Sequence, residues 1–342
     1  MELVVADKFL ISENLNKFDS DISEMWDFDL KDLEELKPQI ERLYEKKAKI
    51  DQSRPLPNTV LQKIKDQLNL EWTYNSNSIE GNTLNLRETQ LILEEGITVG
   101  GKSLREHFEV VNHEKAIDYL YSLINPDYTL RSIDILNLHG YILKNIEDDF
   151  AGRLRNGGVR IVGANFTPPN AKIVPDLFDE LVSFANTNPI NADDLVLATL
   201  FHHRLVWIHP FFDGNGRTVR LAMNLLLMRK GFPPAIILKN DRKKYYEALN
   251  QANKGSYHKL CLLMLQATER SLNMYINSLP GKSYDDYEPI SSIVSEPSFP
   301  YGQEYVSLLA RQGKIDAYKE GKNWLTTKEA VKNYVVNRKR KR

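Results

Sequence analysis

The run His-Pro-Phe-Phe-Asp-Gly-Asn-Gly-Arg-Thr-Val-Arg at residues 209–220 holds an imidazole, a carboxylate, a glycine-rich turn and two guanidinium groups. Gly214 and Gly216 flank Asn215, and glycines at such a turn let successive backbone N–H groups point inward. Where a helix begins at the turn, its positive N-terminal end adds to the attraction for an anion. The run therefore predicts a phosphate-binding cradle.

The charged residues of this run predict how the cradle would be completed. Arg217 and Arg220 are three positions apart, so on a helix they share a face and can hold phosphate groups with forked hydrogen bonds. Asp213 offers the carboxylate that Mg²⁺ or Mn²⁺ prefers when phosphate oxygens complete its coordination shell. His209 precedes the cradle, where its imidazole could take a proton from an attacking hydroxyl. Together these residues predict a nucleotide phosphate site.

The same run resembles the signature of the Fic family, His-Pro-Phe-x-(Asp/Glu)-Gly-Asn-Gly-Arg-x-x-Arg, with every fixed position filled. The resemblance implies transfer of AMP from ATP, the co-substrate, to a Ser, Thr or Tyr hydroxyl of a target protein. It also implies that His209 is the general base, that Asp213 holds the metal, and that Asn215 and Arg217 contact the α and β phosphates. Arg220 would contact the γ phosphate.

Two amphipathic segments are expected to position the run. Apolar residues recur at helical spacing in 195–208, and again in 218–230, which ends at Gly231 and two prolines. The cradle is therefore predicted between two helices. His202 and His203 lie on the first helix, where adjacent side chains point about 100° apart. They cannot converge on one metal ion, so we expect them to be structural.

Ser76 and Glu80 resemble the family's inhibitory helix, (Ser/Thr)-x-x-x-Glu-(Gly/Asn), on a helix near 72–82. Their spacing places both side chains on one helix face, and Gly81 is a natural C-terminal stop. The resemblance implies that Glu80 pairs with Arg220 and competes there with the γ phosphate. The enzyme would then be autoinhibited by its own chain.

A Gly-Gly pair followed by β-branched residues in 152–163 predicts a β-hairpin. The resemblance implies a flap whose edge pairs with the main chain of the target protein. The flap strand is expected to contain Val159, Arg160, Ile161 and Val162.

Tyr246 and Asn253 are seven positions apart, which is about two turns along one helix face. A ring and an amide so placed could stack on adenine and hydrogen-bond to it. Both positions match the adenine pocket of the family.

Composition sets the wider limits. The chain has 342 residues, a net charge of −1 and a single cysteine, Cys261, which excludes a disulfide framework and suits a reducing compartment. Residues 1–14 lack the features of a signal peptide, and no apolar run is long enough to span a membrane. We therefore expect a soluble cytoplasmic protein without a membrane partner, and a homodimer stays open.

The fold predicted is all-α, with a Fic-type helical core, a β-hairpin flap and a small C-terminal winged helix. Three units are expected: an N-terminal helical region at 1–110 that carries the inhibitory helix, a catalytic core at 111–279, and a winged-helix domain at 288–342. In the last unit a helix ended by Gly313, a hairpin through Glu320-Gly321 and a further helix resemble a winged helix-turn-helix.

Three lysines of this unit and a basic tail could meet DNA phosphates, although winged helices also bind proteins. These residues are Lys314, Lys319, Lys322 and the tail 338–342. Two alternatives to AMP transfer follow. One is removal of AMP from a modified protein, with Glu80 orienting a water, and the other is a DNA-binding regulator that responds to nucleotide.

Overall fold

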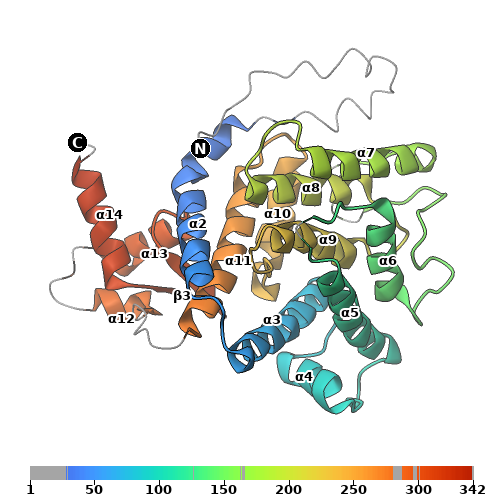
Figure 1. Ribbon diagram of the computed structural model, residues 1–342, viewed down its shortest axis with the longest axis horizontal. Coiled ribbons are helices and arrows are strands. Elements are labelled where there is room, and N and C mark those ends of the chain that lie inside the picture. Colours follow the sequence, from blue (N-terminus) through green and yellow to red (C-terminus); the bar gives the residue numbers. More distant parts are fainter. Residues whose placement is uncertain are drawn as a thin grey trace.

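The structure, a computed structural model, describes residues 28, 30–125, 127–161, 163, 166–279, 287–295, 299 and 301–340, with the backbone alone for 337–340. The described part of the chain is mainly helical, with one small sheet near its C-terminal end (Figure 1). This confirms the all-α prediction. Among the described residues, no helix is both long enough and apolar enough to cross a membrane.

The N-terminal region forms a set of helices that ends beside the catalytic core. Its elements are η2 (Lys31–Leu36), α2 (Lys37–Gln52), α3 (Asn58–Ile79), α4 (Leu86–Glu95) and α5 (Leu104–Ser122). The predicted inhibitory helix is the last part of α3, which is longer than expected, and Glu80 is its C-cap. Helix α5 begins with a capping box in which Ser103 and Glu106 satisfy each other's backbone N–H groups.

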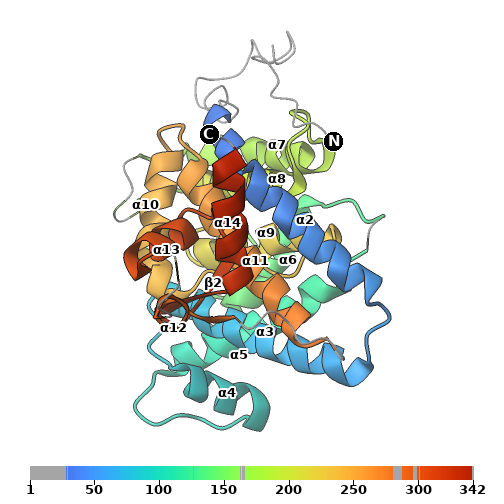
Figure 2. The ribbon, with the colours of Figure 1, turned by 90° about the vertical axis from the view of Figure 1, so that its left-hand side faces the viewer.

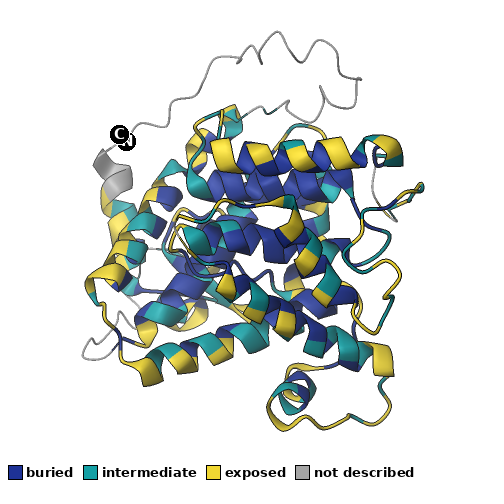
Figure 3. Cartoon of the chain, turned by 45° about the vertical axis from the view of Figure 1, so that its right-hand side comes forward, coloured by how far each residue is buried: buried dark blue, intermediate teal, exposed yellow. Residues whose placement is uncertain are grey.

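The helices of the predicted catalytic core form a bundle around α8 and α9. Its elements are α6 (Ser132–Leu143), η3 (Ala171–Ile173), α7 (Val174–Thr187), α8 (Asp194–Ile208), α9 (Asn215–Arg229), η4 (Lys239–Asp241), α10 (Arg242–Ala252) and α11 (His258–Asn277). Helices α8 and α9 confirm the two predicted helices, although α9 begins at Asn215, inside the glycine-rich turn. Both are buried along most of their length because neighbouring helices cover them (Figure 3).

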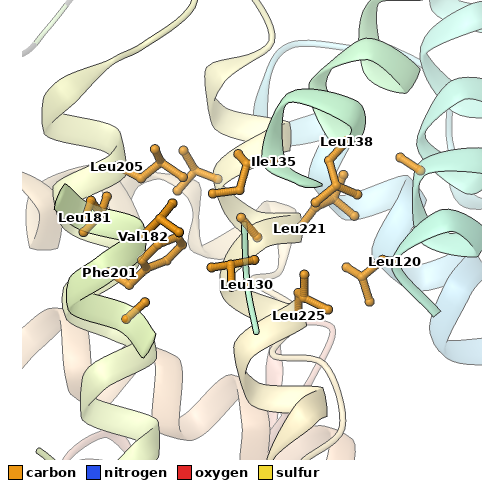
Figure 4. Close-up of a cluster of buried hydrophobic side chains, with 14 of the residues drawn as sticks. Leu120, Leu130, Ile135, Leu138, Leu181, Val182, Phe201, Leu205, Leu221 and Leu225 are labelled. Carbon is orange, nitrogen blue, oxygen red and sulfur yellow. The ribbon is translucent and has the colours of Figure 1, made fainter. Parts of the chain in front are cut away.

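Apolar packing fixes the direction of α8 and α9. Phe201 and Leu205 of α8 meet Leu221 and Leu225 of α9 in one cluster, to which α5, α6 and α7 also contribute (Figure 4). All four side chains are fully buried. Burial of one such side chain contributes about 1.5–3 kcal/mol. The loop between the two helices is therefore held at both ends by a rigid core.

The predicted hairpin at 152–163 does not form a strand pair among its described residues, and Val162 lies outside them. The prediction was wrong because Arg155 bonds the segment to the loop after α8, and no backbone ladder forms among the described residues of the segment. The Arg155 N–H donates to the carbonyl oxygen of Pro210 at 2.8 Å. The Arg155 guanidinium is buried and donates to the carbonyl oxygens of Ile208, His209 and Pro169.

The C-terminal unit has the predicted order of helix, hairpin and helix. Its elements are β1 (Glu288–Pro289), α12 (Ile290–Val294), α13 (Gln303–Arg311), β2 (Ala317–Glu320), β3 (Asn323–Thr326) and α14 (Lys328–Arg340). The strands are antiparallel in the order β1-β3-β2, and Gly321 turns the hairpin at φ +58°. Of the predicted basic tail, the side chains of 338–340 and all of 341–342 lie outside the described residues.

This C-terminal unit packs against α2 and α11 (Figure 2). Glu269 of α11 is buried and accepts from Arg42 at 2.6 Å and from Lys46 at 3.0 Å. Lys46 also lies 2.5 Å from Asp316, which precedes β2. The network is partly or wholly buried, so its charges are stabilised only while all members are present.

Candidate functional site

His209 ends α8 in the left-handed conformation, with φ +48°, while its N–H still donates to the Leu205 carbonyl oxygen at 3.1 Å. Such a backbone costs a non-glycine residue on the order of 1 kcal/mol. Arg155 offsets this cost because its Nε donates to the His209 carbonyl oxygen at 2.8 Å. The imidazole is thereby held at the mouth of the loop that follows.

Asn215 closes that loop through its side chain. Its Oδ1 accepts from the Phe211 N–H at 3.0 Å, and its Nδ2 donates to the Phe211 carbonyl oxygen at 2.8 Å. The amide is buried and bonded at both ends. Asn215 therefore shapes the cradle through its side chain, whereas the resemblance to the family implies that it contacts phosphate.

Gly214 gives the loop its turn and packs tightly against α6. Its φ is +72°, and a Cβ there would lie 3.2 Å from Ile142 Cγ2 and 3.3 Å from His139 Cδ2. The His139 ring stacks on Phe211 at 3.7 Å between centroids. Its Nδ1 accepts from the Gly152 N–H, so Nε2 carries the proton and donates to the Asp213 carbonyl oxygen at 3.0 Å. Burial lowers the pKa of His139 to about 4, which keeps this neutral form.

The cradle lies at the N-terminus of α9. The first helical bond runs from the Thr218 N–H to the Gly214 carbonyl oxygen at 3.0 Å, so the N–H groups of residues 215–217 precede the helical ladder. A helix begins there with three donors and the positive end of its dipole. This geometry is that of an anion site, as the sequence predicts.

Glu80 occupies the cradle. A Cβ placed on Gly216 would overlap the Glu80 carboxylate, and Glu80 Oε1 accepts from Arg220 Nη1 at 2.7 Å. Ser76 binds the other two nitrogens of the same guanidinium. Its Oγ accepts from Nε at 3.1 Å, and its carbonyl oxygen accepts from Nη2 at 2.8 Å. Arg220 is buried, and although burial opposes it, Glu80 raises the pKa of Arg220. The predicted contact between Glu80 and Arg220 is therefore present in the structure.

The cradle opens into a cavity of about 390 Å³. It is lined by Glu80, Gly81, Asn82, Arg105, Glu106, Glu109, His209, Phe212, Asp213, Gly214, Asn215, Gly216 and Arg217. The cavity thus brings together His209, the glycine-rich turn and the predicted metal ligand, as well as α5 residues that the sequence did not single out.

His209 is suited to accept a proton. Burial lowers the pKa of His209 to about 4, while the Val206 carbonyl and the Glu80 and Asp213 carboxylates oppose this effect. The imidazole is therefore neutral near pH 7 and has a lone pair available.

Asp213 and Arg217 carry the remaining charges of the motif. Asp213 Oδ1 accepts from the Gly214 N–H at 2.6 Å and its Oδ2 from Arg105 at 2.5 Å. Burial raises the pKa of Asp213, but the Gly214 N–H, Arg217 and Arg105 together bring it below its usual value. Arg217 is buried, and neither its Nε nor its Nη1 has a hydrogen-bond partner among the described residues, although Nη1 forms an ion pair with Glu109 at 3.3 Å.

The donor set at Asp213 fits a hard divalent cation. No cluster of three or more His, Cys, Asp or Glu side chains that could hold a metal occurs among the described residues. One carboxylate facing the cavity is what Mg²⁺ needs when phosphate oxygens and waters supply its other ligands. Asp213 would hold such an ion only together with a nucleotide.

Neither of the predicted adenine contacts, Asn253 and Tyr246, lines this cavity. Asn253 Oδ1 bonds with His203 Nε2 at 2.8 Å, which holds the amide against α8. Tyr246 lies under the Arg242 guanidinium at 4.9 Å and is near enough to Glu80 and Arg220 that both affect its pKa, which burial raises. His203 also bonds with Tyr257, and His202 with Tyr245, so both histidines are structural, as predicted.

Four residues at the site were missed from the sequence: Arg105, Glu109, His139 and Arg155. Arg105 and Glu109 are spaced as an ordinary surface pair on a helix, although they closely follow the Glu80 motif. Arg155 and His139 bond to backbone atoms of the loop, and no side-chain pattern encodes such contacts.

Comparisons with known proteins agree with this geometry. The sequence model of the Fic/DOC family matches residues 129–227. The chain is similar to protein adenylyltransferase fic-1 of Caenorhabditis elegans, 36% identical over 66% of this chain and 45% of that protein. It is also similar to protein adenylyltransferase Fic of Nematostella vectensis, 36% identical over 70% of this chain and 56% of that protein. The chain thus spans about half the length of these curated relatives.

Solved structures give the same result over a larger share of each chain. A segment of Fic-1 from C. elegans has a TM-score of 0.64 at 33% identity, covering 71% of both chains. A Fic-domain signalling protein from Bacteroides thetaiotaomicron has a TM-score of 0.65 at 28% identity, covering 72% of this chain and 98% of that one. This chain belongs to the Fic family.

Proposed function

We propose that this protein transfers AMP from ATP to a Ser, Thr or Tyr hydroxyl of a target protein and that Glu80 holds it inactive. The observation that carries the proposal is the position of the Glu80 carboxylate over Gly216, in the anion cradle and on Arg220. A carboxylate bound there marks where a phosphate would bind, because both are anions recognised by the same donors.

The chain's own groups can hold the phosphates. The backbone N–H groups of residues 215–217 precede the helical ladder at a helix N-terminus, and the Nε of Arg217 has no hydrogen-bond partner among the described residues. Arg220 would exchange the Glu80 carboxylate for a further phosphate group. A cation held by Asp213 would, when bound, supply positive charge that offsets charge on the phosphates.

His209 then acts as the general base. Its neutral imidazole lines the cavity beside the cradle, so it can accept the proton of a hydroxyl that attacks the α phosphorus. The oxygen of the hydroxyl forms the new bond to phosphorus, the bond to the β-phosphate oxygen breaks, and pyrophosphate leaves with that electron pair. Positioning and electrostatic stabilisation supply most of the acceleration in such transfers.

The target would bind along the segment that Arg155 anchors. Val159, Arg160 and Ile161 lie outside every helix and strand of the described residues. Their main chain is available to pair with a target's main chain. For the adenine, Tyr246 is the better supported contact, since Asn253 is bonded to His203.

The proposal is tested by incorporation of label from ATP carrying ³²P at the α position. The proteins compared are the wild type, Glu80→Gly, and Glu80→Gly combined with His209→Ala, with self-modification as the readout. We expect label to rise in Glu80→Gly and to vanish when His209 is also replaced. Absence of label in all three, although ATP binds, would reject AMP transfer.

Removal of AMP is a second candidate because Glu80 and His209 line the same cavity. There, Glu80 would orient a water and a modified protein would release AMP. Release of label from a pre-modified target by the wild type, lost in Glu80→Gly, would favour this reaction.

A DNA-binding regulator is less well supported. Lys319, one of the lysines predicted to meet DNA, lies 2.6 Å from Asp241 and is held against the catalytic core. Its charge is therefore already neutralised within the chain. A gel shift on random DNA with a steep salt dependence would restore this alternative.

A further inference from the structure

Four charged side chains form a closed ring at the mouth of the cradle. Arg105 and Glu109 come from α5, and Asp213 and Arg217 come from the motif. Around the ring, Arg105 lies 2.5 Å from Asp213, Asp213 lies 4.0 Å from Arg217, Arg217 lies 3.3 Å from Glu109, and Glu109 lies 3.5 Å from Arg105. The signs alternate, so each motif charge is neutralised by a charge from α5.

Helix geometry explains why α5 can supply both partners. Arg105 and Glu109 are four positions apart and therefore lie on one face, one turn from each other. Ser103 caps the helix just before them, which fixes where that face points. Arg105 also lies 3.3 Å from Glu147, so a third carboxylate, besides Asp213 and Glu109, holds it at the cavity mouth.

The two α5 charges have the signs of the proposed ligands. Arg105 places a cation on Asp213, the residue that would hold a metal ion, and Glu109 places an anion on Arg217, which would hold a phosphate. Glu109 is a carboxylate of the cavity that is separate from Glu80, which bonds to Arg220. It is anchored by Asn82, whose Nδ2 donates to Glu109 Oε2 at 2.8 Å.

We propose that Arg105 and Glu109 are a built-in cation and anion that must be displaced from Asp213 and Arg217 before a metal-bound nucleotide can bind to these two residues. The inference rests on the proposed function, because it takes a metal-nucleotide as the ligand. The pair thereby sets the metal requirement and phosphate affinity of the site, independently of Glu80. Arg105 is about half exposed and can swing out, so the ring can open without disturbing the core.

The test measures binding, with ADP as the probe and Mg²⁺ or Mn²⁺ as the metal. All variants are made in the full chain with Glu80→Gly, so that Glu80 no longer blocks the cradle. Calorimetry gives the affinity for ADP with and without Mg²⁺, and electron paramagnetic resonance of Mn²⁺ reports metal binding directly. The variants are Arg105→Ala, Arg105→Lys and Glu109→Gln, which keeps the Oε atom that Asn82 contacts.

Because Arg105 would compete with the metal ion for Asp213, its removal should change metal binding and metal-free ADP binding in opposite directions. Arg105→Ala should lower the metal concentration for half-maximal binding by about two- to tenfold, the range expected for partly exposed ion pairs, yet weaken ADP binding without metal. Arg105→Lys should fall between this variant and its parent. Glu109→Gln should strengthen ADP binding without metal by a similar factor. Lys243→Ala is the control, since it removes one member of an exposed i,i+4 pair on α10, and it should change neither affinity.

A higher metal concentration for half-maximal binding in Arg105→Ala, or weaker ADP binding without metal in Glu109→Gln, would overturn the inference. Either result would show that α5 positions the motif charges for their ligands. ADP binding with the same metal dependence in every variant would overturn it while leaving the proposed function intact. Failure of ADP to bind any variant, including Glu80→Gly alone, would overturn both.

Discussion

The carboxylate of Glu80 lies so close to the backbone of Gly216 that even a methyl group on Gly216 would overlap it. Gly216 is the second residue of α9, so the carboxylate stands directly on the positive end of that helix. A larger residue at this position would force the end of the Glu80 side chain to shift. The cradle is thus shaped around an anion that the chain itself provides.

Gly216→Ala should therefore destabilise the wild type but not the Glu80→Gly variant. Within a helix, alanine is favoured over glycine by about 1 kcal/mol, so we expect any harm from the substitution to come mainly from its overlap with Glu80, since the Arg220 Nη1 lies farther away, at 3.1 Å from the added Cβ. We expect a coupling of about 1 kcal/mol or more between the two positions, measured by urea unfolding of the four proteins in a double-mutant cycle. An equal effect of Gly216→Ala with and without Glu80 would contradict the overlap.

Stability should fall as pH drops below about 6.5, because His113, His202 and His203 are buried and neutral. Burial lowers the pKa of His203 to about 3 and holds the pKa of His113 and His202 well below the usual value. The unfolded chain therefore binds protons that the folded chain does not. Each histidine contributes about 1.4 kcal/mol of unfolding free energy per pH unit, present above pH 6.5 and lost toward the folded pKa.

Replacing one of these histidines should reduce that slope by about one proton. His203→Gln keeps a hydrogen-bonding amide, and its unfolding free energy between pH 7 and 5 should fall less steeply than that of the wild type. His258→Gln, on a partly exposed histidine at the start of α11, is the matched control. Parallel slopes for His203→Gln and the wild type would mean that His203 is not neutral in the folded protein.

Glu269→Ala should be strongly destabilising. Its carboxylate is buried between Arg42 and Lys46, and removing it leaves two cations with one fewer anion. Loss of one partner from a buried ion pair costs about 3–5 kcal/mol. Thermal and urea unfolding would measure this, with Lys243→Ala, in an exposed pair, expected to change stability by less than about 0.5 kcal/mol. A similarly small effect of Glu269→Ala would show that water reaches the network.

Arg155→Lys should separate target modification from nucleotide binding. Arg155 reaches the carbonyl oxygens of Ile208, His209 and Pro169 through two separate nitrogens, and the single nitrogen of a lysine does not reproduce this fork, so the segment would loosen from the loop. In a Glu80→Gly background we expect ADP affinity to stay within about twofold while label incorporation falls at least about tenfold. Faster hydrogen exchange in 156–161 would support the cause, and unchanged exchange with unchanged labelling would refute it.

Much of the site was predictable because its signal is local. The spacing of Gly214, Gly216 and the two arginines encodes a helix start with bound anions, and α9 does begin at Asn215. Helical periodicity also predicted α8 and the position of His209 at the end of that helix. The contact between Glu80 and Arg220 joins segments far apart in the chain, and it was reached only through the resemblance to a family.

The failures arise where long-range contacts decide the structure. The 152–163 segment has the composition of a hairpin, yet Arg155 bonds it to the loop after α8, and a ladder with itself does not form. Lys319 is one of the lysines predicted to meet DNA phosphates, yet its charge is neutralised by Asp241. In each case the competing partner is distant in sequence, and local patterns carry no information about it.

The pairing of motif charges with α3 and α5 has an evolutionary consequence. Arg220 forms an ion pair with Glu80, Arg217 with Glu109, and Asp213 with Arg105. A reversal of charge on one side leaves its partner uncompensated, so such substitutions are expected to arise as coordinated pairs. A chimera that joins the N-terminal half of one relative to the motif half of another would combine charges that do not pair. Such a chimera would fail because of this mismatch, although the pairs are intact in each parent protein.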